Sequence, residues 1–155
     1  MATSNAATTF LEHRILNFIF KNNAQVGGAN FGTGNGNGLG DNIWVGLATA
    51  VSDAETGSTS DLTETTFTNY TRKQITASNW TLDSATENEQ QAKNSANIEW
   101  SASGTDANVT ITHVFIASAS TSGNIYFVGA LDTPKTLALG DIFRINAENL
   151  IVEMK

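Results

Sequence analysis

The residue types that carry out acid–base or nucleophilic chemistry are sparse in this sequence of 155 residues. His13 falls in an expected helix, and His113 shares an expected strand face with Ile111 and Phe115, which favours a hydrogen-bonded, half-buried imidazole over a general base. Residues 83–89 hold carboxylates of the kind that glycosidases use in pairs, but they fall in an expected loop without aromatic partners on both sides. No serine occupies a Gly-x-Ser-x-Gly elbow. We therefore predict that the protein is not an enzyme.

The aromatic residues suggest a second kind of chemistry, the stacking of flat rings on sugars. Three tryptophans and two tyrosines are available, and the many asparagine and threonine side chains offer partners for sugar hydroxyl groups. The alternative is core packing, which strand aromatics flanked by alternating aliphatic residues favour. Trp100, which follows Glu99 at the end of an expected strand, is the aromatic that we single out as a carbohydrate contact.

Cofactor and metal sites have no support in the sequence. There is no cysteine, which excludes disulfides, thiol nucleophiles and cysteine zinc sites. The glycine-rich tract at residues 26–41 lacks the preceding strand, the closing Gly-Lys-Ser/Thr and the following helix of a phosphate-binding loop, and Asp41 is its one carboxylate, too few for a calcium-binding repeat. We predict no cofactor and no metal. We expect the tract to be a loop or arm in which Phe31 and Leu39 are anchors that order it against a neighbouring subunit.

One amphipathic helix is expected close to the N-terminus. Thr9, with Glu12 three residues later, has the pattern of a capping box. Apolar residues then recur at helical spacing, namely Leu11, Ile15, Leu16, Phe18 and Ile19. This stripe predicts packing on the domain's own sheet, with part of it as an alternative contact for a partner chain. Phe10 and Phe20 fall off the stripe and are the residues that we expect at a protein–protein interface.

The rest of the chain reads as short strands separated by turns. Strands are expected at residues 43–48, 70–76, 80–82, 96–100, 109–118, 124–130, 141–146 and 150–154. The only proline, Pro134, predicts a turn at residues 132–135. The pattern predicts a mainly β fold, an antiparallel β-sandwich of jelly-roll or immunoglobulin-like strand order with one N-terminal amphipathic α-helix. We expect one structural domain, with the helix and glycine-rich arm at residues 1–41 and the sandwich at residues 42–155.

Charge and hydropathy exclude several classes of partner. Charged residues make up 15% of the chain, against about 25% in an average soluble domain, and the formal net charge is −7. An acidic chain is poorly suited to contact nucleic-acid phosphates, which requires clustered lysine and arginine. The N-terminus has no basic n-region, and the apolar run at residues 15–20 is interrupted by Asn17 and too short to cross a bilayer. We expect no nucleic acid or membrane partner.

The order of these patterns resembles a known family. The matching pieces are the helix from Phe10 to Phe20, Trp44-Val45-Gly46-Leu47-Ala48-Thr49 leading to Asp53, Glu64, Tyr70-Thr71-Arg72, Asn97-Ile98-Glu99-Trp100, residues 111–116, residues 123–136 and Gly140-Asp141. They resemble small tailed-phage virion proteins, common in marine and cyanobacterial phages and often labelled tail fibre or hypothetical structural proteins. The glycine-rich tract is longer than this family pattern implies, and the loop before Tyr70 is rich in threonine rather than glycine.

The resemblance implies a non-catalytic virion component, synthesised in the host cytoplasm. The sequence has no coiled-coil heptads or collagen-like repeats, so we expect a capsid decoration or cement protein on the capsid exterior that bridges and stabilises subunits of the major capsid protein. Lattice symmetry then favours a homotrimer. The alternative is a tail fibre or tail-associated module that recognises carbohydrate on the host surface.

Overall fold

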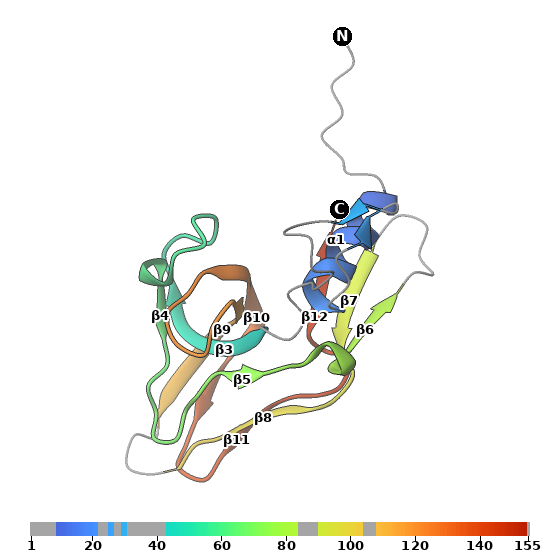
Figure 1. The fold of residues 1–155 in the computed structure, drawn as a ribbon. Coiled ribbons are helices and arrows are strands. Elements are labelled where there is room, and N and C mark those ends of the chain that lie inside the picture. Colours follow the sequence, from blue (N-terminus) through green and yellow to red (C-terminus); the bar gives the residue numbers. More distant parts are fainter. Residues whose placement is uncertain are drawn as a thin grey trace. The chain divides into compact units, whose positions relative to one another are not determined.

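A computed structural model describes residues 9–21, 25–26, 29–30, 43–83, 90–103 and 108–154. Within these residues the protein is mainly β, its strands pair antiparallel, and one α-helix lies near the N-terminus (Figure 1). The predicted fold class, a mainly antiparallel β protein with one N-terminal helix, is therefore confirmed.

The contacts divide the chain into two compact units, each built from separate segments. Unit 1 comprises Met1–Asp41, Thr76–Ala96 and Asn146–Lys155, and unit 2 comprises Asn42–Ile75 and Asn97–Ile145. The structure does not follow the predicted division at residue 41, because the helix groups with segments from the middle and the end of the chain. The physical reason is that a helix of 12 residues with an apolar face is stable only where a sheet covers that face.

Unit 1 is a helix against a small sheet. Its elements are α1 (Thr9–Phe20), β1 (Gln25–Val26), β2 (Ala29–Asn30), the 3-10 turn η2 (Ala77–Asn79), β6 (Trp80–Asp83), β7 (Gln90–Asn94) and β12 (Ile151–Met154). The sheet has the order β12-β7-β6, and α1 contacts β7 and β6. β1 and β2 pair with each other.

The buried face of α1 differs from the predicted stripe. Glu12, Leu16 and Phe20, which are spaced four residues apart and so share one helix face, are all buried, whereas Leu11 is 37% exposed. The Phe20 ring packs on Trp80 with 4.4 Å between ring centroids. The assignment of Phe20 to a partner interface is therefore wrong: its side chain is fully buried within unit 1.

A buried amide connects the strands of unit 1 to the segment that precedes β12. Asn94 is completely buried, and its Nδ2 donates to the carbonyl oxygens of Ala96 at 2.8 Å and Asn146 at 2.9 Å. Its Oδ1 accepts from the backbone N–H of Leu150 at 2.8 Å. A buried polar side chain is tolerated only when it is paired in this way, so Asn94 specifies how the C-terminal segment returns to β7.

Unit 2 contains the larger sheet. Its elements are β3 (Trp44–Val51), the 3-10 turn η1 (Thr59–Asp61), β4 (Leu62–Glu64), β5 (Lys73–Gln74), β8 (Ile98–Ser101), β9 (Val109–Ala117), β10 (Ile125–Leu137) and β11 (Ile142–Ile145). The sheet has the order β10-β9-β3-β4, and β5 also pairs with β3. β8 and β11 form a separate antiparallel pair. Ile43, Val45 and Leu47 are fully buried, as the alternation in this strand predicts.

Strand β10 runs through the proline that we expected in a turn. Ala130 pairs with His113 and Lys135 pairs with Ile111, so residues 131–134 face a single residue of β9 and form a bulge. Pro134 has no N–H to donate, and a bulge on an edge strand is where this loss is tolerated. The predicted turn at 132–135 is therefore wrong, and the irregularity makes the exposed edge of β10 a poor template for pairing with another chain.

Candidate functional site

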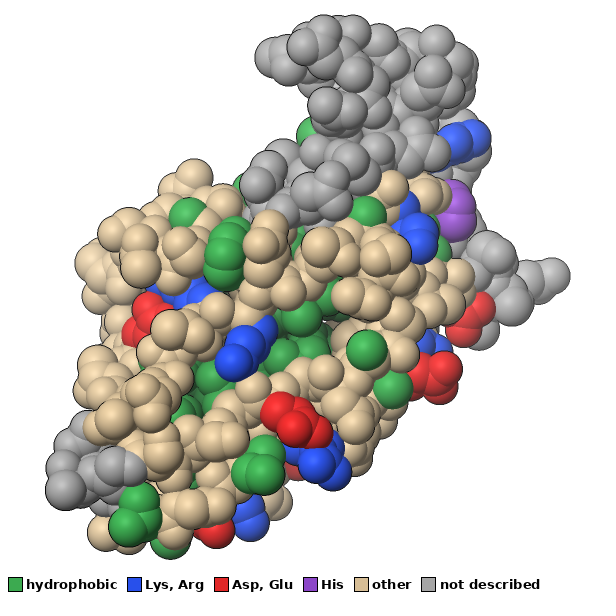
Figure 2. All heavy atoms as spheres, turned by 60° about the horizontal axis from the view of Figure 1, so that its bottom comes forward, with side chains coloured by type: hydrophobic (Ala, Val, Ile, Leu, Met, Phe, Trp, Pro, Cys, Tyr) green, Lys and Arg blue, Asp and Glu red, His purple; other side chains and the backbone are tan. Residues whose placement is uncertain are grey.

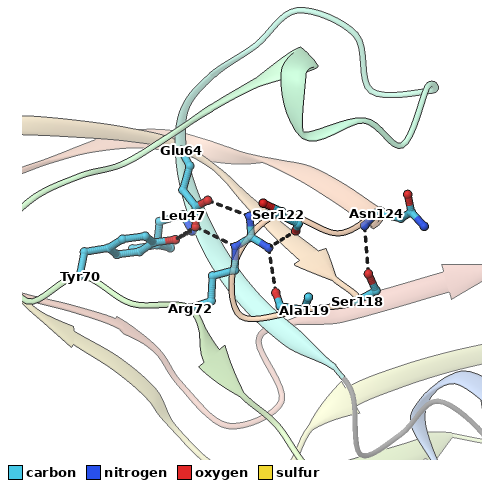
Figure 3. A network of polar contacts seen from close by, with 8 residues as sticks. All are labelled: Leu47, Glu64, Tyr70, Arg72, Ser118, Ala119, Ser122 and Asn124. Carbon is cyan, nitrogen blue, oxygen red and sulfur yellow. Dashed lines mark hydrogen bonds and ion pairs between the residues drawn. The ribbon is translucent and has the colours of Figure 1, made fainter.

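Arg72, which lies between β4 and β5, makes four hydrogen bonds to other parts of unit 2. Its Nε and Nη2 donate to the two carboxylate oxygens of Glu64 at 2.9 and 2.8 Å, a bidentate pair (Figure 3). Its Nη1 donates to the carbonyl oxygens of Ala119 at 2.8 Å and Ser122 at 2.7 Å. The Arg72 side chain is only 2% exposed, whereas that of Glu64 is 27% exposed. The guanidinium therefore fastens the end of β4 to the turn between β9 and β10.

Tyr70 completes this group by filling a gap in the sheet. β4 and β5 pair with different parts of β3, at residues 48–51 and 44–45, which leaves Leu47 between them. Its carbonyl oxygen accepts from Thr65 N at 3.0 Å, and its N–H donates to the Tyr70 hydroxyl at 2.9 Å. The same hydroxyl donates to Glu64 Oε1 at 2.7 Å. We call Glu64, Tyr70 and Arg72 the Arg72 cluster.

Burial sets the protonation state of Tyr70. Removal of the phenol from water raises its pKa well above the ordinary value near 10, and the hydrogen bond to the Glu64 carboxylate raises the pKa further. The hydrogen bond from Leu47 N lowers the pKa but does not overcome these two effects. Tyr70 is therefore a neutral hydroxyl group that accepts from one neighbour and donates to the other.

A glycine makes room for the aromatic ring beneath the arginine. The Arg72 Cζ lies 5.0 Å from the centre of the Phe115 ring, which is within cation–π range. Phe115 stands opposite Gly46 across the β3–β9 pair, and a Cβ on Gly46 would lie 2.2 Å from Phe115 Cζ. Only glycine therefore fits at position 46 while the ring keeps this position.

The turn that Arg72 fastens is itself built with unusual backbone geometry. Ser122 and Gly123 have φ values of 54° and 77°, in the left-handed region. Ser118 Oγ accepts from Asn124 N at 2.9 Å, and a Cβ on Gly123 would lie 2.6 Å from that oxygen (Figure 3). The glycine and the two arginine hydrogen bonds therefore both stabilise the turn at residues 118–124.

A hollow of about 720 Å³ opens beside the Arg72 cluster. We call it the Trp44 hollow. Its apolar wall includes the half-buried rings of Trp44 and Tyr70, and its rim includes exposed hydroxyl residues at 66, 71 and 120–122. Thr65 also lines the hollow; it is 2% exposed, and its hydroxyl has no hydrogen-bond partner among the described residues. Among the lining residues that the structure describes, Arg72 is the one cation. Its guanidinium already donates hydrogen bonds to Glu64 and to two carbonyl oxygens.

A second, shallower depression of about 440 Å³ lies over β10 and β11. Residues of the β10 bulge and of β11 line it, among them Leu131, Lys135 and Ile142. Ile142 is 52% exposed, and the neighbouring Leu139 is 64% exposed. Its lining also includes the charged residues Asp132 and Arg144, and Arg144 pairs with Glu99 at 2.6 Å.

The predicted site residues fall in different places. Trp100 is wrong as a carbohydrate contact, because it is 2% exposed, packs on Phe143 and donates its indole N–H to Thr71 O at 2.8 Å. The side chain of Phe10 and all of Phe31 and Leu39 lie outside the described residues. His113 is half-buried and hydrogen-bonded to Thr112 Oγ1 at 2.7 Å, as predicted.

Sequence reasoning missed Trp44 as the accessible tryptophan, although a signal was present. Ile43, Val45 and Leu47 alternate on the core side of β3, so Trp44 must face the opposite side of the strand. The pairing of Arg72 with Glu64 had no such signal, because the two residues are eight positions apart across an irregular segment.

The described surface is mainly neutral and polar. Figure 2 shows one face on which uncharged polar side chains and backbone predominate and charged side chains are scattered. In the part of the chain that the structure describes, no group of three or more histidine or acidic residues is placed to hold a metal ion. No helix in that part is long and apolar enough to cross a membrane.

Comparison with known proteins gives one family. A comparison with curated proteins finds no match. A family model described as "Podophage GP4 fiber I protein gp80" matches residues 6–153, which is nearly the whole chain and includes both units. The chain therefore belongs to this family of phage virion proteins.

Proposed function

We propose that this protein is a non-enzymatic structural component of a podophage fibre. The observation that carries the proposal is the family match over residues 6–153, because it covers all the elements described above except the last residue of β12. The name of the family model favours a fibre over the capsid decoration role that the sequence suggested.

The Arg72 cluster supports a structural rather than a catalytic role. Glu64 accepts from Arg72 and Tyr70, and Arg72 donates in addition to two carbonyl oxygens. General acid–base catalysis needs a group whose pKa lies near the working pH. The raised pKa of Tyr70 moves this hydroxyl away from that range. The cluster therefore supports a role in holding the sheet edge and the turn together.

The lengths of the secondary-structure elements favour a second candidate function, capsid decoration. The described part of the chain contains strands of up to 13 residues and one helix of 12 residues, and it has no long helix of the kind that forms a fibre shaft. A compact module of this kind is also suited to a capsid lattice, where it would contact the major capsid protein as a homotrimer.

The location and copy number of the protein in the virion separate the two candidates. Purified virions are disrupted, tails and emptied capsids are separated, and the protein is quantified in each fraction by mass spectrometry. The fibre proposal predicts a few copies per particle, recovered with the tails. Hundreds of copies recovered with capsids would overturn it and support the decoration role.

A further inference from the structure

We propose that the depression over β10 and β11 binds a second copy of this chain, in a dimer with a two-fold axis. We call this region the β11 surface, and its residues are Leu131, Asp132, Lys135, Leu139, Ile142 and Arg144. All of them belong to unit 2. Such a dimer goes beyond the proposed fibre role and does not depend on it.

The first observation is the exposure of large apolar side chains. Leu139 and Ile142 are 64% and 52% exposed, the two highest values among the large hydrophobic residues that the structure describes. Ile142 lines the depression with Leu131 and the buried Phe143, and Leu139 directly precedes this segment. Protruding and recessed apolar groups therefore lie side by side on one surface. Contiguous apolar groups of this kind mark surfaces that bind another protein.

The turn that carries Leu139 is fastened by hydrogen bonds. Asp141 N donates to Ala138 O at 3.0 Å, and Asp141 Oδ2 accepts from Ala138 N at 2.9 Å. Gly140, with a φ of 90°, donates its N–H to Ala102 O at 2.7 Å. The backbone under Leu139 is therefore ordered before a partner arrives, which lowers the entropy cost of binding.

Charge identifies a second copy as the partner. The formal net charge of the chain is −7, so like-charge repulsion opposes contact between copies. The depression is different, because Lys135 and Arg144 balance Asp132 and Glu99, the partner of Arg144. A two-fold axis brings the same surface of both copies together, so Lys135 of one copy can pair with Asp132 of the other. A surface with both signs of charge is in this way complementary to itself.

The backbone of β11 adds polar groups to this surface. Ala102 N donates to Asp141 O at 2.8 Å, so the antiparallel alternation directs the backbone groups of Phe143 toward β8 and those of Ile142 and Arg144 away from it. No described strand pairs with that edge of β11. A second copy can therefore add hydrogen bonds to the apolar contact.

Sedimentation velocity of the full-length protein tests whether the dimer exists. At concentrations from about 1 µM to about 1 mM, we expect a monomer–dimer equilibrium with a micromolar dissociation constant, as is usual for a small interface. A monomer at every concentration overturns the proposal. A trimer also overturns it, because a two-fold interface is complete with two copies.

The variant Leu139→Thr tests the apolar contact. Leu139 is exposed, so the melting temperature should not change, while the dissociation constant should rise by at least about tenfold because each dimer contains the substitution twice. Ile151→Thr is the matched control, since Ile151 is 45% exposed but belongs to unit 1, and it should leave the dissociation constant unchanged. Equal dissociation constants of the wild type and Leu139→Thr would overturn the assignment.

A charge exchange tests the two-fold arrangement. Lys135→Glu and Asp132→Lys, both at exposed positions, should each weaken the dimer, because each sets like charges against each other. An equal mixture of the two variants should form dimers at a concentration where either alone is monomeric, because opposite charges then meet at both positions. Absence of this rescue would overturn the proposed pairing.

Hydrogen exchange locates the interface. The backbone N–H groups of Ile142 and Arg144 should exchange more slowly at a concentration that favours the dimer than at one that favours the monomer. Protection confined to other residues would overturn the location. The outcome is independent of the fibre proposal, since recovery of the protein with capsids would overturn the fibre role and leave the dimer measurement unaffected, and the reverse also holds.

Discussion

At the scale of single residues, the pair of the buried Arg72 with the partly exposed Glu64 is an interaction whose loss should be costly. Two charges that are taken out of water contribute little net stability to a protein, but removal of one partner leaves the other buried and uncompensated. Here the loss of Arg72 would also release the carbonyl oxygens of Ala119 and Ser122. The same residue that orders the rim of the Trp44 hollow is therefore essential to unit 2.

The variant Arg72→Met should lower the free energy of unfolding by about 3 kcal/mol, somewhat less than for a fully buried pair because Glu64 is partly exposed. The matched control is Arg144→Met, which breaks the pair of Arg144 with Glu99 at 2.6 Å. That pair is 49% and 42% exposed, so the expected loss is below about 1 kcal/mol. Urea unfolding measures both values, and equal losses would contradict the structural role of Arg72.

Tyr70 gives the protein a specific dependence on alkaline pH. Its pKa is raised in the folded state, so the folded protein keeps the phenol proton where the unfolded chain has released it. The stability from this group is complete below the ordinary pKa of 10.0 and is lost as the pH rises above it. Above that pH, unfolding free energy should fall by up to about 1.4 kcal/mol per pH unit more steeply in the wild type than in Tyr70→Phe. Parallel pH profiles of the two proteins would contradict this assignment.

At the scale of elements, the central strand β3 depends on a close approach between backbone and ring. Gly46 lies in β3 directly opposite Phe115 of β9, and the ring occupies the space of a Cβ. Gly129, in the neighbouring strand β10, has no atom within 4 Å of the position where its Cβ would stand. The structure therefore requires glycine at position 46 but leaves room for a larger side chain at position 129.

This difference predicts opposite outcomes for two identical substitutions. Gly46→Ala should destabilise the protein by about 1–3 kcal/mol or more, because Phe115 has to move and loses its contact with Arg72. Gly129→Ala should change stability by less than about 0.5 kcal/mol. Thermal unfolding followed by circular dichroism compares the two, and a large loss in Gly129→Ala would show that the space around Gly129 is not as described.

At the scale of the whole molecule, the chain builds two units from interleaved segments, and each has its own core. In unit 1 the core is formed by Leu16, Phe20, Trp80 and Val152, which come from the two ends and the middle of the chain. The N-terminal helix is therefore part of a folded unit and not an appendage of a separate sandwich. A destabilising substitution in α1 should therefore lower the local stability of residues 76–96 and 146–155 more than that of unit 2.

Hydrogen exchange of the full-length protein tests this organisation. Phe20→Ala should cost about 3–5 kcal/mol in unit 1, because the ring is fully buried against Trp80. Exchange should accelerate in residues 76–96 and 146–155 more than in residues 43–75 and 97–103. Leu11→Ala, at a position that is 37% exposed, is the control and should change exchange little. Uniform acceleration through the whole chain would contradict two separate cores.

The sequence by itself determined the fold class, the existence of the helix and the inward face of β3, because these depend on local periodicity and turn chemistry. The order of the patterns also pointed to phage virion proteins, and the family match over residues 6–153 confirmed that relation. Local patterns do not depend on which segments meet in space, so they can be read from the chain directly.

The tertiary structure alone decided which aromatic rings are buried, how the segments divide and what surrounds Arg72. Trp100 and Phe20 are buried because of the elements that pack on them, not because of their own neighbours in sequence. The bulge that contains Pro134 depends in the same way on the register of β9. Pairings between distant segments are set by the packing of the whole unit, and period and composition do not encode them.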